Sequence, residues 1–180
     1  PTICEGLAFT VTDLSTQPGA GQLIRWTWNM GDSTTRDLTN AGSFTHTYAR
    51  PGTYAVSLRV ANARGCLSNP YTATVTAGYQ PEAAFALPEV CLNDAFAEFT
   101  NSARVGGNTP LTYAWQFGDG ALSADRNPRH RYSAAATYSV TQVVRTNIGC
   151  ADTATRVFTV NGAVPDAVVS LRNAGPLCSN

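Results

Sequence analysis

An internal repeat constrains the fold of this chain more than any other feature of its sequence. Cys4, Cys91 and Cys178 lie 87 residues apart, and Trp28 and Trp115 have the same separation. Later in the repeat the spacing is 84 residues, which separates His46 from His130, Tyr48 from Tyr132, Tyr54 from Tyr138, Gly65 from Gly149 and Cys66 from Cys150. Self-similarity at a fixed period is typical of repeat proteins, so the sequence predicts a tandem array of similar modules.

The repeat also predicts where each module begins and ends. We expect residues 1–79 to form a module without its first strand, residues 80–162 a complete module, and residues 163–180 the first strand and start of a third. Pro81 and Pro165 occupy matched positions in two short connections. Short linkers that contain proline limit the swing between neighbours, so we expect a quasi-one-dimensional array.

Each copy shows the side-chain alternation of β-strands. Residues 53–60 and 137–144 alternate large apolar with small or polar side chains, as do residues 24–28 and 111–117. Turn dipeptides such as Pro51-Gly52 and Asn161-Gly162 separate these runs. Several short strands in about 85 residues, with turns between them, predict a β-sandwich with almost no helix.

Charge and hydropathy exclude two classes of partner. The 12 basic residues, all arginine, balance 12 acidic residues, and the net charge is zero. Nucleic-acid binding requires a basic face, so we expect no nucleic-acid partner. The longest apolar runs are a few residues, far short of a membrane-spanning helix, so we expect no direct membrane insertion.

Three short motifs in each copy carry a family resemblance. In the second copy they are Trp115-Gln116-Phe117-Gly118-Asp119-Gly120, then Asn127-Pro128-Arg129-His130-Arg131-Tyr132, then Thr137-Tyr138-Ser139-Val140. The chain resembles tandem PKD (polycystic-kidney-disease) repeats over nearly its whole length. The resemblance implies an all-β fold of tandem Ig-like (PKD-type) β-sandwiches of about seven strands each. The core and turn positions of the motif are Trp28, Gly31, Asp32, Tyr48, Tyr54, Trp115, Gly118, Asp119, Gly120, Tyr132 and Tyr138.

The five cysteines are expected to form disulfides within each module. We pair Cys4 with Cys66 and Cys91 with Cys150, and place the partner of Cys178 beyond the chain end. A zinc site is the alternative, but the chain has no C-x-x-C motif and only one histidine in each copy. Persistent disulfides indicate an extracellular or cell-surface location. The cysteine pattern also resembles that of PKD repeats in large Bacteroidota surface proteins.

Few residues are candidates for catalysis, metal binding or modification. His46 and His130 occupy one repeated position near a turn, which favours a structural role, so we expect no catalytic residues and no enzyme activity. We expect no cofactor; Glu82 and Asp166, which follow matched prolines, are the candidates for calcium. Ser33 and Thr153 lie in the short D-S/T pattern of bacterial O-glycosylation, while Trp26 is expected in the core.

These observations favour a structural function. We expect a non-catalytic segment of a long extracellular stalk, fibre or adhesin on a bacterial surface. The alternative is a spacer or substrate-targeting module of a secreted hydrolase. The expected partners are neighbouring repeats of the same chain and other copies in a fibre. The strand expected at residues 167–171 either continues a longer chain or completes module one of another molecule by strand donation.

Overall fold

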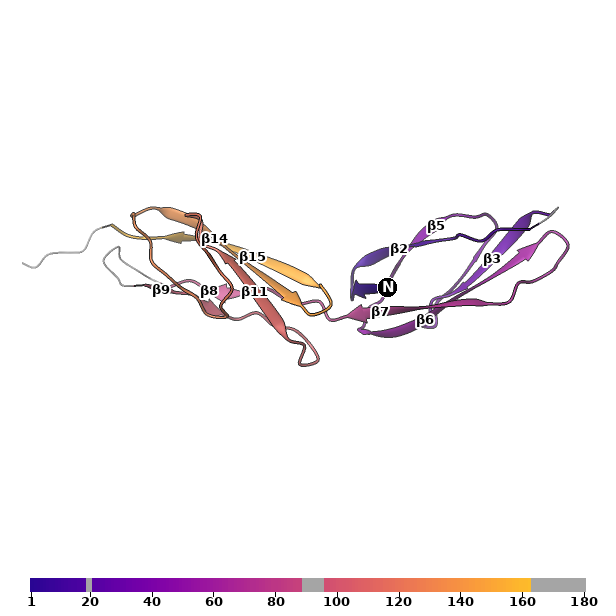
Figure 1. Cartoon of the computed structure of the whole chain (residues 1–180), viewed down its shortest axis with the longest axis horizontal. Coiled ribbons are helices and arrows are strands. Elements are labelled where there is room, and N and C mark those ends of the chain that lie inside the picture. Colours follow the sequence, from indigo (N-terminus) through magenta and orange to yellow (C-terminus); the bar gives the residue numbers. More distant parts are fainter. Residues whose placement is uncertain (19–20, 89–95, 163–180) are drawn as a thin grey trace, which may run out of the picture.

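Two β-sandwich modules lie end to end in the computed structural model (Figure 1). The structure describes residues 1–18, 21–88 and 96–162. Every regular element in these ranges is a strand, which confirms the prediction of tandem all-β sandwiches. The predictions for Cys91, Asp166, Cys178 and residues 163–180 lie outside the described residues.

Module one is the unit of seven strands from β1 to β7. Its larger sheet has the order β1-β7-β6-β3-β4, and β2 pairs with β5 in the facing sheet. All neighbours are antiparallel except β1 and β7, which are parallel. The strands are β1 (Thr2–Cys4), β2 (Ala8–Thr12), β3 (Leu23–Asn29), β4 (Thr35–Leu38), β5 (Ser43–Thr47), β6 (Gly52–Asn62) and β7 (Tyr71–Gly78).

Module two is the unit from β8 to β15 and repeats this plan. Its larger sheet has the order β12-β11-β14-β15, and the pairs β13-β9 and β10-β8 face it. All of these pairs are antiparallel. The strands are β8 (Phe85–Ala86), β9 (Ala97–Glu98), β10 (Thr100–Asn101), β11 (Leu111–Gln116), β12 (Leu122–Ser123), β13 (Arg129–His130), β14 (Thr137–Thr146) and β15 (Ala151–Thr159).

Each module has its own core, built on the alternating residues of its strands. Trp28 and Trp115 are buried at matched positions, as the repeat predicts, and Trp26 is buried beside Trp28. In module two, Gln142 replaces the buried Leu58 of module one. The Gln142 Nε2 atom donates a 2.7 Å hydrogen bond to Asn101 Oδ1. This bond provides the buried amide group with a hydrogen-bond partner inside the sandwich.

Candidate functional site at the junction between the modules

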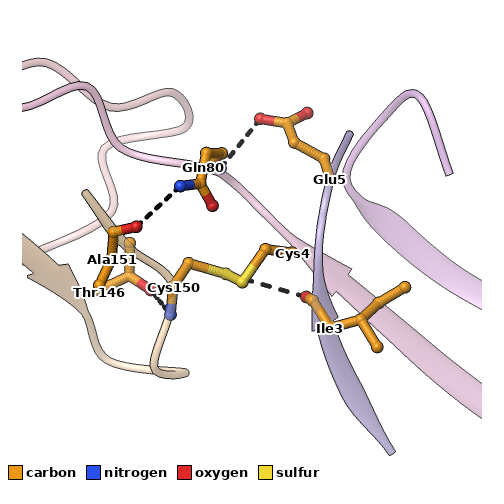
Figure 2. The surroundings of a disulfide bond; sticks show 7 residues. All are labelled: Ile3, Cys4, Glu5, Gln80, Thr146, Cys150 and Ala151. Atoms are coloured by element: carbon orange, nitrogen blue, oxygen red, sulfur yellow. Dashed lines mark hydrogen bonds between the residues drawn. A yellow bond between two sulfur atoms is a disulfide. The ribbon is translucent and has the colours of Figure 1, made fainter. Parts of the chain in front are cut away.

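A disulfide connects the two modules. Cys4 is bonded to Cys150, with Cα atoms 5.6 Å apart and a separation of 146 residues in sequence. Figure 2 shows this bond between β1 of module one and the turn before β15 of module two. The predicted pairs Cys4–Cys66 and Cys91–Cys150 are therefore wrong.

The position of each cysteine along its sandwich explains the error. Cys4 pairs with Gly78 at the last residue of β7, whereas Cys66 lies in the turn before β7 begins at Tyr71. A strand of eight residues separates these two ends, which is about 25 Å at about 3.3 Å per residue. A disulfide joins Cα atoms no more than about 7 Å apart, so Cys4 cannot reach Cys66 in the folded module.

The turn that carries Cys150 is held by its own hydrogen bonds. Thr146 N–H donates to Cys150 O at 2.8 Å, and Cys150 N–H donates to Thr146 Oγ1 at 3.1 Å. Gly149 has φ +94°, in the left-handed region that glycine adopts without strain. Cys150 itself is buried. The turn therefore presents the sulfur to module one in a fixed direction.

The linker between β7 and β8 packs against two turns of module two. A Cβ atom on Gly78 would lie 1.7 Å from Ile148 Cδ1, so only glycine lets Ile148 approach this closely without rearrangement. On the other side, the ring of Tyr79 lies against Gly106 and Gly107, where added Cβ atoms would fall 2.4 and 2.2 Å from ring carbons. The linker is thus packed between two turns of module two.

Polar contacts complete the junction (Figure 2). Gln80 N–H donates to Glu5 Oε1 of module one at 3.1 Å, and Gln80 Nε2 donates to Ala151 O of module two at 2.8 Å. Gln80 therefore bridges both modules from the linker. The repeat places Tyr79 and Gln80 in the short connection that ends at Pro81, but it predicts neither their contacts nor Ile148, because these depend on how neighbouring modules meet.

The Gly-Asp turns that recur in the two modules form a second repeated feature, and the histidines belong to it. His46 Nε2 lies 2.9 Å from Asp32 Oδ2, and His130 Nε2 lies 2.7 Å from Asp119 Oδ2. Burial opposes ionisation of Asp32, but hydrogen bonds from Thr34 and His46 outweigh it and lower the pKa of this carboxyl below 3.8. These contacts tie the turn to β5 in module one and to β13 in module two, which favours the structural role over catalysis.

The motif tyrosines close the same end of each sandwich. Tyr48 Oη donates to Met30 O at 2.6 Å, and Tyr132 Oη donates to Phe117 O at 3.0 Å. Burial, followed by the charge of Asp32, raises the pKa of Tyr48 to about 12. Tyr54 and Tyr138 stack on these rings from β6 and β14. The four tyrosines are core and turn residues, as expected from the repeat.

Gly31 and Gly118 make the turn possible. Both have positive φ, +82° and +85°. A Cβ atom on Gly31 would lie 2.9 Å from backbone atoms of Ala55, and one on Gly118 would lie 2.8 Å from Ser139 O. Ser33 takes φ +74° nearby, a conformation that costs a residue with a side chain about 1–2 kcal/mol.

The modification and metal candidates stay predictions. Ser33 and Thr153 are both exposed, as a glycosylation site must be. Glu82 is exposed and forms an isolated β-bridge with Arg104. Within the described ranges, no group of three or more histidine, cysteine or acidic side chains could hold a metal ion.

Comparison with known proteins agrees with the repeat and the sandwich topology. A family model described as a PKD domain matches residues 1–77 and 79–161. The chain belongs to the PKD domain family. PKD domains occur in secreted and surface proteins and are typically non-catalytic modules. In the described part of the chain, no helix is long and apolar enough to cross a membrane.

Solved structures with similar folds include single PKD domains. The PKD1 domain of Vibrio anguillarum Epp is 29% identical, with 47% of this chain and 96% of that chain covered and a TM-score of 0.43. The PKD1 domain from Vibrio cholerae metalloprotease PrtV is 29% identical, with 46% and 98% covered and a TM-score of 0.42. The fibronectin(III)-like modules of Clostridium thermocellum CbhA are 14% identical, with 95% and 94% covered and a TM-score of 0.47.

Proposed function

We propose that this chain is a non-catalytic structural segment of a long extracellular stalk, fibre or adhesin on a bacterial surface. The observation that carries the proposal is the disulfide from Cys4 to Cys150, which joins successive modules to each other. A bridge within one module stabilises that module alone. A bridge across a junction fixes the direction of the next module, which is what a stalk requires.

The junction limits bending in two ways. The backbone and the disulfide connect the modules side by side, because Cys4 and Gly78 are register partners on adjacent strands. Two neighbouring covalent connections permit less rotation than a single linker. Ile148 against Gly78 and Tyr79 against Gly106 and Gly107 then block motion on both sides of the linker. The array should therefore behave as a stiff rod, with little bending between neighbouring modules.

The disulfide also supports the extracellular location. Disulfides persist in oxidising compartments and are reduced in most cytosols. Reduction would leave the modules joined only by the short linker and its non-covalent contacts. A stalk with this junction is thus suited to the cell exterior, where the disulfide between its modules stays oxidised.

Small-angle X-ray scattering of the chain before and after reduction tests the clamp. We expect the oxidised chain to give one narrow distribution of distances between modules, and the reduced chain a broader one. Cys150→Ser should match the reduced chain without reductant, and Cys66→Ser should match the oxidised chain. An identical distribution in all four samples would show that the disulfide does not set the geometry.

The full-length reading frame separates the stalk from the alternative. Many consecutive copies of this module favour the stalk, fibre or adhesin. One or two copies beside a catalytic domain would instead favour the spacer or targeting module of a secreted hydrolase.

A further inference from the structure

The two cysteines of the junction disulfide differ in their contact with solvent. Cys150 is 1% exposed, whereas Cys4 is only half-buried. The Cys150 sulfur lies 3.9 Å from the carbonyl oxygen of Ile3, and a Cβ atom on Gly78 would lie 3.8 Å from the same sulfur (Figure 2). Module one therefore covers the Cys150 side of the bond, while Cys4 keeps part of its surface in solvent.

This difference decides how a thiol can break the bond. A disulfide is reduced when a thiolate attacks one of its two sulfur atoms. The attacked sulfur enters a mixed disulfide with the reagent, and the other sulfur leaves as a thiolate. Because attack requires access, a small thiol reaches Cys4 Sγ more easily than Cys150 Sγ. Cys150 is then the leaving group.

We propose that the junction disulfide is a redox latch with one reactive side. A small thiol such as glutathione forms a mixed disulfide with Cys4. The released Cys150 then either closes the original bond again or is carried away from Cys4 when the modules separate. This latch rests on the proposed function, in which the same disulfide holds neighbouring modules together.

The released Cys150 thiolate is poorly stabilised while the modules stay together. Its side chain is buried against module one, so a charged sulfur in this place loses most of its hydration. The two hydrogen bonds between Cys150 and Thr146 involve backbone atoms of Cys150 and not its sulfur. The assembled junction therefore favours the return of this thiolate to Cys4.

One contact that holds the released Cys150 near Cys4 is the bridge made by Gln80. Its backbone N–H donates to Glu5 Oε1, next to Cys4, and its Nε2 atom donates to the carbonyl oxygen of Ala151, next to Cys150. Neither hydrogen bond involves a sulfur atom. Both can therefore persist after the disulfide has been exchanged.

A second contact acts in the same way. Ile148, two residues before Cys150, packs on Gly78, which is the register partner of Cys4. Groups held together by other contacts react at a high effective concentration. We therefore expect Cys150 to attack Cys4 Sγ and expel glutathione rapidly as long as the modules remain in contact.

Complete reduction requires a second glutathione thiolate. It attacks the glutathione sulfur of the mixed disulfide, which forms oxidised glutathione and releases the Cys4 thiolate. In total, two glutathione thiols are oxidised to one disulfide, and the protein disulfide is reduced to two thiols. The two protons of the glutathione thiols pass through solvent to Cys4 and Cys150.

Separation of the modules decides between closing and complete reduction. In a relaxed array, the junction contacts return Cys150 to Cys4 before the second glutathione arrives. Tension along the array pulls the modules apart once the bond has been exchanged, because only non-covalent contacts and the linker then hold them. The latch therefore makes the redox state of the junction depend on its mechanical state.

Two variants that keep one junction cysteine each test which sulfur is reactive. Both carry Cys66→Ser; one adds Cys150→Ser and the other adds Cys4→Ser. Each chain is incubated with oxidised glutathione and cleaved after arginine, which places Cys4 in residues 1–25 and Cys150 in residues 146–156. We expect Cys4 to acquire glutathione about tenfold faster than Cys150, a difference of about 1.4 kcal/mol between the two barriers.

The intact disulfide allows the same comparison in one molecule. The oxidised Cys66→Ser chain is treated briefly with reduced glutathione, and the reaction is stopped with acid before cleavage. We expect the glutathione adduct of residues 1–25 to exceed that of residues 146–156 by the same factor, because attack at Cys4 produces only the first adduct.

Replacement of Gln80 tests whether the junction contacts control complete reduction. Gln80→Ala removes the hydrogen bond to Ala151 O, and Gln116→Ala, at an exposed position in β11, is the matched control. We expect Gln80→Ala to be reduced about two- to tenfold faster, the change expected for one lost hydrogen bond. Gln116→Ala should match the original chain. Denaturant unfolding of both variants checks that the modules still fold.

Three results would overturn the latch. Equal rates of modification at Cys4 and Cys150 would show that module one does not shield Cys150. A glutathione adduct mainly on Cys150 would reverse the assigned roles. Equal reduction of folded Gln80→Ala and Gln116→Ala would show that reduction does not depend on the junction contacts. The two comparisons of cysteines decide the matter even where Gln80→Ala fails to fold.

Failure of the latch is distinguishable from failure of the proposed function. Scattering compares the oxidised and reduced end states and does not depend on which sulfur reacts first. If Cys4 and Cys150 react equally but reduction broadens the distances between modules, the latch is wrong and the disulfide still sets the geometry. If scattering is identical in both states, the role of the disulfide in the stalk is wrong even where Cys4 is the reactive cysteine.

Discussion

Pulling the chain by its two ends should reveal the junction disulfide directly. In the oxidised chain, force enters at Pro1, crosses from Cys4 to Cys150, and leaves along β15 toward Asn180. Residues 5–149 lie inside the closed loop and carry no load. β15 is already extended, so little chain remains to stretch. We therefore expect an oxidised molecule to show no unfolding step from either module.

Reduction should release both modules at once. Breaking the single bond adds 146 residues to the loaded path, which is about 500 Å of extended chain at about 3.3–3.6 Å per residue, less the folded length. Modules one and two then unfold one after the other. In a constant-force measurement with terminal handles, both unfolding steps should become available after one reduction event.

Two variants serve as controls for this experiment. Cys150→Ser should show both unfolding steps without reductant, and Cys66→Ser should behave like the original chain. Two separate reduction events, each followed by the unfolding of one module, would refute the reasoning. That pattern requires a bridge inside each module, which is incompatible with a bond between Cys4 and Cys150.

Three further predictions concern stability, measured by denaturant unfolding of the reduced chain. Trp115→Ala should destabilise module two by about 3–5 kcal/mol, whereas Val157→Ala at an exposed site should change it by less than about 0.5 kcal/mol. Hydrogen bonds from His130 and Ala121 outweigh burial and lower the pKa of Asp119 below 3.8, so its stabilisation is full above pH 3.8 and is lost as pH falls through the lower folded pKa. Between pH 5 and pH 3 the free energy of unfolding should fall less for Asp119→Asn than for the original chain. An equal fall in both would contradict this. Gly118→Ala should cost more than Gly120→Ala, because both have positive φ but only the first meets backbone within 4 Å; equal costs would show that contact with Ser139 is unimportant.

The fold was predictable because local patterns and the repeat pointed to the same answer. Trp28 and Trp115 are spaced by one period and are both core residues. The alternation in residues 53–60 lies within β6, which begins at Gly52 of the Pro51-Gly52 dipeptide. All strand pairs among the described residues lie within one module, so each copy carries the information for its own sandwich.

The junction was not predictable for the opposite reason. The repeat shows that Cys66 and Cys150 are equivalent, but equivalence does not tell which end of the sandwich a cysteine occupies. That depends on β1 pairing in parallel with β7, which places Cys4 beside Gly78. Parallel pairing of distant strands has no short-range sequence signal comparable with a hairpin turn. The contacts of Tyr79 and Gln80, and the role of Ile148, were missed because they depend on how the two modules meet at the linker.

A clamp repeated along an array would limit its length and not only its bending. If every late cysteine bonds the early cysteine of the preceding module, one path runs from Cys4 to Cys150, along the backbone to Cys178, and across the next clamp. Of the 174 residues from Cys4 to Cys178, only the 28 after Cys150 lie on this path. Those 28 residues span about 100 Å when fully extended, compared with about 600 Å for the unclamped chain. The 146-residue separation of Cys4 and Cys150 thus withdraws most of the polypeptide from the load. A stalk built in this way stays near its folded length under tension even if individual modules unfold. A disulfide confined to one module does not span the linker, so it cannot take the load off the linker.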